Sequence, residues 1–123
     1  MNYYKNIEYL KQNNIDVESS LELLGDQEIY DETLNDFLEE SERRLPKIEE
    51  YKNNKDMENY AILVHAMKGD SKYLGFTDLA DISLNHQLKS QENDYEYIIN
   101  NYDELMEEVN RVINIINLYL DKQ

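Results

Sequence analysis

Glycine and proline are so scarce in this chain that few tight turns can interrupt it. The 123 residues include 3 glycines and 1 proline. A β-sandwich or a doubly wound α/β fold needs many more turn residues than that. Because apolar residues make up 41% of the chain, they can form one modest core. The sequence therefore predicts a single all-α domain over residues 1–123.

Apolar residues recur every three to four positions in six segments, which is the spacing of amphipathic helices. The expected helices cover residues 2–13, 17–24, 27–52, 57–73, 78–90 and 95–120. Asp16, Asp26, Asp56 and Thr77 are the expected N-caps, and Pro46 is expected to kink or briefly break the third helix. Four long helices with short joins predict an antiparallel four-helix bundle, with one or two short N-terminal helices at one end.

The net charge of −15 limits the partners that the protein can bind. It disfavours nucleic acid and anionic membranes, because both repel an acidic surface. Cysteine is absent, which excludes disulfides and thiol chemistry and fits a cytoplasmic location. No apolar run is long enough to span a membrane or to act as a signal peptide. The start at Met1 favours a stand-alone protein, and we expect a monomer.

His65 is the candidate reactive residue. At 100° per residue, it points roughly 160° from the middle of the apolar stripe of its helix, so it should face outward. Ala61 and Gly69 on the same side leave the ring accessible. Access to the ring would explain Gly69, because glycine inside a helix is ~1 kcal/mol less favourable than alanine. Lys68 and Lys72 on this side could pair with the oxygens of a phosphorylated imidazole. A solvated face is the alternative for both lysines, and it is the favoured one for Lys72 taken alone.

The run from His65 to Phe76, HAMKGDSKYLGF, resembles the signature of the histidine phosphotransfer (HPt) domain family. The family pattern is His-x-apolar-Lys-Gly, followed by small residues and an apolar-Gly pair, here Leu74-Gly75. The resemblance extends over residues 14–120. It implies that His65 is the phosphoacceptor, that Lys68 steadies the phosphoryl group and that Gly69 keeps the site open. Gln87 stands where the family often has a side chain that hydrogen-bonds the other ring nitrogen.

The resemblance also implies a function in a two-component phosphorelay. His65 would exchange a phosphoryl group with the Asp of a response-regulator receiver domain, so the protein would be a covalent carrier rather than a turnover enzyme. The partners would be receiver domains, a hybrid sensor histidine kinase, or both. No cofactor is expected in this chain, because the receiver would supply Mg²⁺. Docking needs apolar surface, for which Ile7, Leu10 and Ile15 are candidates, although a core position is the favoured alternative for most of them.

Two residues depart from the family pattern. Asp70 replaces a small residue near the apolar stripe, so it should either bond a tyrosine hydroxyl or be exposed by a rotation of the helix. Its charge could weaken phosphorylation. His86 occupies a position that is commonly apolar, and a hydrogen-bonded, semi-buried histidine is expected there.

Two other functions remain open from the sequence. The first is a non-catalytic helical adaptor that keeps a vestigial histidine and binds a signalling partner. The second is a di-metal helical enzyme, which needs glutamate three residues before a histidine. Ile62 and Ser83 stand at those positions, so the sequence argues against this enzyme.

Overall fold

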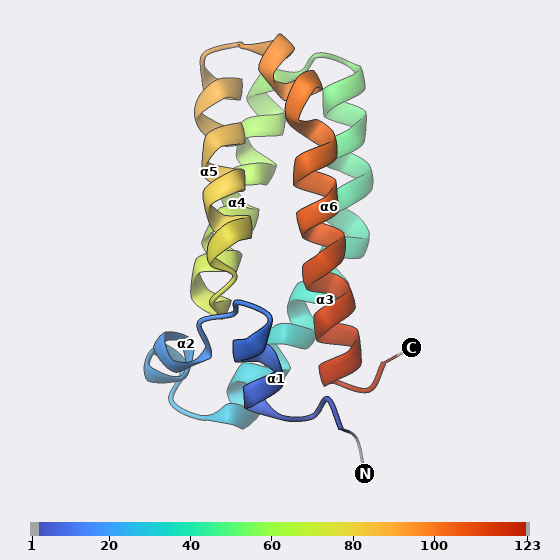
Figure 1. Cartoon of the computed structure of the whole chain (residues 1–123). Coiled ribbons are helices and arrows are strands. Elements are labelled where there is room, and N and C mark those ends of the chain that lie inside the picture. Colours follow the sequence, from blue (N-terminus) through green and yellow to red (C-terminus); the bar gives the residue numbers. More distant parts are fainter. Residues whose placement is uncertain (1–2, 123) are drawn as a thin grey trace.

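The computed structural model describes residues 3–122, which form six α-helices and no strand. The helices are α1 (Ile7–Gln12), α2 (Val17–Leu24), α3 (Gln27–Asn53), α4 (Met57–Leu74), α5 (Thr77–Gln91) and α6 (Tyr95–Tyr119). The four long helices run up and down in an antiparallel bundle, and α1 and α2 lie at its lower end (Figure 1). The predicted all-α bundle is confirmed.

Aspartate caps start most of these helices, as the sequence predicts. The side chains of Asp16, Asp26 and Asp56 each accept a hydrogen bond from a backbone N–H in the first turn of α2, α3 and α4, respectively. Thr77 was expected to cap α5, and this prediction is wrong. The N-cap residue is Phe76, which makes no side-chain cap. Its ring is buried edge-on against Phe37, so core packing decides where this helix begins.

Two other helix predictions need correction. The first helix begins at Ile7 rather than at residue 2, because Asn6 accepts from the backbone N–H of Glu8 and caps it there. Residue 2 itself lies outside the described residues. Pro46 does not break α3, which continues from Gln27 to Asn53, so the expected break is wrong and the kink stays a prediction. Pro46 is exposed, so the carbonyl that it leaves without a partner can face water.

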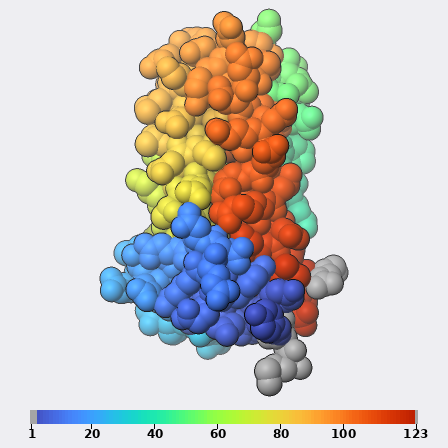
Figure 2. Space-filling model, viewed as in Figure 1, coloured from blue at the N-terminus to red at the C-terminus, as the bar shows by residue number. Residues whose placement is uncertain are grey.

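The N-terminal helices complete the core instead of offering an apolar docking surface. Leu10 and Ile15 are only 0% and 3% exposed, and Ile7 packs half-buried against them. The core alternative is therefore confirmed for these residues, and the hypothesis that they form a docking surface is wrong. In Figure 2 the N-terminal segment covers the lower end of the bundle, where the apolar ends of the long helices would otherwise meet water.

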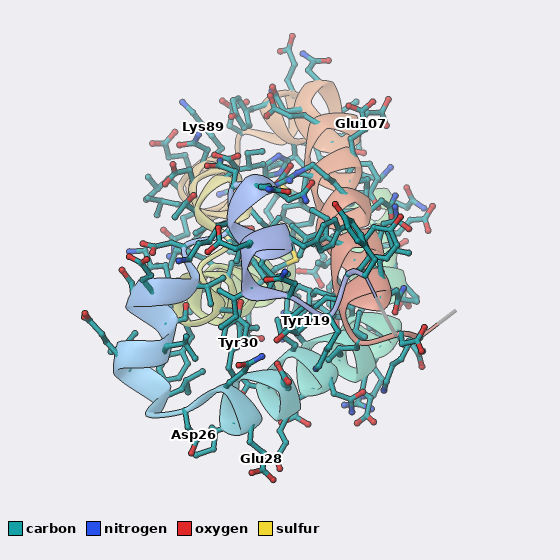
Figure 3. The ribbon with its side chains drawn as sticks, turned by 60° about the horizontal axis from the view of Figure 1, so that its bottom comes forward. Asp26, Glu28, Tyr30, Lys89, Glu107 and Tyr119 are labelled. Carbon is teal, nitrogen blue, oxygen red and sulfur yellow. The ribbon has the colours of Figure 1, made fainter. Side chains whose placement is uncertain are left out.

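Two tyrosines anchor the helix ends at this lower end (Figure 3). The Tyr30 hydroxyl donates to the carbonyl oxygen of Leu74 at 2.8 Å. The Tyr119 hydroxyl donates to Asp31 at 2.8 Å and accepts from Gln27 at 2.9 Å. These bonds tie α3 to the end of α4 and to the end of α6.

A backbone joint holds the start of α2 against the turn between α4 and α5. The backbone N–H of Asp16 donates to the carbonyl oxygen of Gly75 at 2.8 Å. Gly75 has a φ of +86°, and a Cβ added there would lie 2.4 Å from the carbonyl oxygen of Asp16. Glycine is the residue that both tolerates the positive φ and has no Cβ to clash with Asp16.

His86 lies inside the bundle and bonds to two other helices. The residue is 0% exposed, so it is fully buried rather than semi-buried. Its Nε2 lies 3.1 Å from the carbonyl oxygen of Asn101, and its Nδ1 lies 2.8 Å from the hydroxyl of Tyr60. Since a carbonyl can only accept, Nε2 carries the proton and Nδ1 accepts from the tyrosine. Burial lowers the pKa of His86 to about 4, although the bond to Asn101 opposes this shift.

We expect Gly75→Ala to lower the free energy of unfolding by about 3 kcal/mol, through left-handed strain and the clash with Asp16. Gly25→Ala is the matched control, because Gly25 also has a positive φ but has nothing within 4 Å of an added Cβ. It should cost about 1 kcal/mol. Urea unfolding of both variants measures the difference, and equal losses would show that the joint with Asp16 is not tight.

Acid should destabilise the fold through His86. The unfolded chain binds a proton near the ordinary pKa of 6.5, whereas the folded chain does so only near 4. Stability from the neutral ring is therefore complete above pH 6.5 and falls as the pH drops toward 4, by about 3 kcal/mol. Comparing unfolding of the wild type and His86→Gln across this range isolates the effect from the carboxylates. Parallel pH profiles for the two proteins would contradict it.

Candidate functional site

His65 lies on the outer side of α4, exposed to solvent, as its helical position predicts. Its Nδ1 lies 3.0 Å from Oε1 of Gln87 on α5. An amide oxygen can only accept, so Nδ1 carries the ring proton and Nε2 keeps its lone pair. Within residues 3–122, no side chain or backbone group hydrogen-bonds Nε2. The nucleophilic nitrogen of a neutral imidazole is thus open to solvent.

A groove of about 630 Å³ adjoins His65 between α4 and α5. Its lining residues are Glu58, Ala61, Ile62, His65, Gln87, Ser90, Gln91 and Asn93. Ala61 is only 6% exposed and lines the groove as a buried residue, while Ile62 is 58% exposed. The sequence predicts Ala61 beside His65, whereas Ile62 was not among the predicted site residues. The signal was available, since Ile62 is an apolar residue one turn before His65.

Gly69 and two lysines follow His65 along the same side of α4. A Cβ added at Gly69 would meet nothing within 4 Å, so no contact inside the protein requires glycine there. Lys68 is half-buried and Lys72 is exposed. Neither lysine has a carboxylate partner among the ion pairs of the described residues. Both ammonium groups therefore remain available to an anion at this face.

Asp70 is held by an arginine rather than by a tyrosine. Its carboxylate lies 2.8 Å from the guanidinium of Arg44 on α3, and its side chain is 46% exposed. The predicted bond to a tyrosine hydroxyl is wrong, whereas partial exposure is confirmed. The Arg44 side chain is only 6% exposed, so the pair lies against the core. The positive charge of Arg44 opposes the negative charge that Asp70 brings to this helix.

The described residues contain no group of three or more His, Asp or Glu side chains arranged to hold a metal ion. No helix in this part of the chain is long and apolar enough to cross a membrane. The geometry around His65 can support nucleophilic attack by its ring. Its hydrogen-bonded ring has a defined proton position, open space beside it, and two unpaired cations nearby.

Comparison with protein-family models matches the Hpt domain over residues 32–114, which is more than half of the chain. No match was found among the curated proteins or the solved structures. The matched residues include α4, α5 and the contact between His65 and Gln87. Hpt domains interact with response-regulator receiver domains. The chain therefore belongs to the Hpt domain family and has a phosphotransfer-type role in two-component signalling.

Proposed function

We propose that this protein relays a phosphoryl group between His65 and the phosphorylated aspartate of a receiver domain. The observation that carries the proposal is the hydrogen bond between His65 Nδ1 and Gln87, which leaves Nε2 as the free nucleophile. The exposed position of His65 supports it, because the receiver's aspartyl phosphate must reach the ring directly.

In the forward step, the Nε2 lone pair attacks the phosphorus of the aspartyl phosphate. The new N–P bond forms as the bond between phosphorus and the carboxyl oxygen of the aspartate breaks, and the electron pair of that bond remains on the aspartate carboxylate. The ring keeps its proton on Nδ1, so positive charge develops on the imidazole. The amide oxygen of Gln87, 3.0 Å away, stabilises that charge. The same steps in reverse return the phosphoryl group.

The surroundings of His65 suit a phosphorylated ring. Lys68 and Lys72 can pair with the phosphoryl oxygens, and no ion pair within the described residues competes for them. The receiver supplies Mg²⁺ and most of the charge stabilisation in the transition state. The partner is a receiver domain, a hybrid sensor histidine kinase, or both in turn. This chain acts as a covalent carrier and as a monomer.

Ile62 replaces the N-terminal residues as the apolar part of the docking surface. It is 58% exposed and lines the groove that adjoins His65. Exposed apolar side chains beside a reactive group can be buried by an approaching partner.

His65→Gln should abolish phosphoryl acceptance and leave the fold intact, because the side chain is exposed and contributes little to the core. Incubation with a phosphorylated receiver should place an acid-labile, alkali-stable phosphate on the wild type alone. Circular dichroism and receiver binding serve as controls for folding and docking. A wild type that binds the receiver but never gains phosphate would instead support the adaptor function.

Gly69→Ala should stabilise the helix by up to ~1 kcal/mol, since its Cβ enters open space. The same methyl group should slow phosphotransfer severalfold if the receiver approaches this face closely. Asn100→Ala is the control, because Asn100 is an exposed residue inside α6. It should gain helix stability without altering transfer. Wild-type transfer rates in Gly69→Ala would show that the receiver does not pack against this face.

A further inference from the structure

A buried polar bridge crosses the bundle next to the proposed site. It consists of Tyr60 on α4, His86 on α5 and Asn101 on α6, joined by the 2.8 Å and 3.1 Å hydrogen bonds of the His86 ring. The Tyr97 ring of α6 also packs edge-on against His86. No step of the proposed phosphotransfer uses these groups. A fully apolar side chain would fill the same place without exposing any polar atom to a dry interior.

His86 and Gln87 are consecutive residues of α5, so their side chains leave the helix about 100° apart. When the His86 ring is held between α4 and α6, the rotation of α5 about its own axis is fixed at this level. Gln87 then points toward the outer edge of α4, where it meets Nδ1 of His65. Apolar packing alone would fix this rotation less sharply, because it has no directional preference.

The direction in which the Gln87 side chain points depends on the rotation of α5 about its axis. Among the described residues, its side chain makes one hydrogen bond, the 3.0 Å contact with His65. A hydrogen bond weakens steeply when its angle or length departs from the optimum. A small rotation of α5 would therefore release the ring of His65 and allow its proton to sit on either nitrogen.

We propose that His86 is a positioning residue for His65, and that the bridge of Tyr60, His86 and Asn101 holds Gln87 in the geometry that keeps the proton of His65 on Nδ1. The inference rests on the proposed function of His65 as phosphoacceptor. The bridge acts only through Gln87 and does not touch the transferred group.

The first test reads the proton position directly. Nitrogen NMR of ¹⁵N-histidine-labelled protein at pH 8, without phosphate, distinguishes an Nδ1–H ring from a mixture of the two neutral forms. The wild type should show His65 protonated on Nδ1. His86→Phe should move the His65 signals toward those of Gln87→Ala, in which the accepting amide is gone. The double variant Tyr60→Phe/His86→Phe also removes the Tyr60 hydroxyl that the single change leaves without its partner. It should give the same shift if the single variant folds poorly.

The second test is a double-mutant cycle on phosphotransfer from a phosphorylated receiver. His86→Phe should slow transfer roughly five- to tenfold, the effect of losing about one hydrogen bond. Adding Gln87→Ala to it should slow transfer no further, because both changes remove the same contact. Val112→Ala, a buried truncation on α6, controls for lost stability and should leave the His65 signals and the transfer rate unchanged.

Unchanged His65 nitrogen signals in His86→Phe would overturn the inference, and so would fully additive losses in the cycle. Failure of the proposed function looks different, since then the wild type itself accepts no phosphoryl group. The NMR comparison still decides the positioning role of His86 in that case, because it requires no phosphate.

Discussion

The packing of α4 against α5 is the interaction on which the candidate site depends. His65 comes from one helix and its hydrogen-bonding partner Gln87 comes from the other, so their 3.0 Å contact exists only while the two helices keep their register. Two features of the fold hold that register. At one end, the joint between Asp16 and Gly75 braces the turn that connects the two helices. Further along, His86 bonds to Tyr60 across the same interface.

The sequence predicted what depends on local pattern and missed what depends on contacts between distant segments. The outward position of His65 and the aspartate caps follow from helical periodicity and from the first turn of each helix, and both are confirmed. Arg44 was not identified as the partner of Asp70, because the two residues lie on different helices. The position of Arg44 on the buried stripe of α3 could have indicated that it has an acidic partner, because a buried charge needs one. For Leu10 and Ile15 the sequence places the N-terminal helices at one end of the bundle but does not decide whether these side chains face the core or a partner, because that depends on contacts with the long helices.

The charge near His65 differs from the net charge of the protein. A net charge of −15 would repel a phosphoryl group if it were spread evenly. The nearest acidic residue on α4 after the histidine, Asp70, is paired with a buried guanidinium, while Lys68 and Lys72 have no carboxylate partner among the described residues. Local pairing therefore leaves the two lysines that follow His65 available to an anion, although the protein as a whole is strongly negative and Glu58 lines the groove on the other side of the histidine along α4. The net charge of the protein bears on nucleic acid, whereas the charge near His65 bears on the phosphorylated ring that we propose.

His86 has a cost that an apolar residue would not have. Burial disfavours the charged imidazolium and so lowers the pKa of His86 to about 4. Both ring nitrogens must also have hydrogen-bonding partners inside the protein. In return, its hydrogen bonds are directional, so they limit the rotation and sliding of α5 against α4 and α6, which apolar contacts tolerate. The phosphoacceptor role that we propose for His65 relies on one amide from the neighbouring helix, so a defined rotation of that helix would offset the cost of the buried imidazole. The polar residue in the core is therefore best understood together with the exposed histidine, because the adjacent Gln87 connects the two.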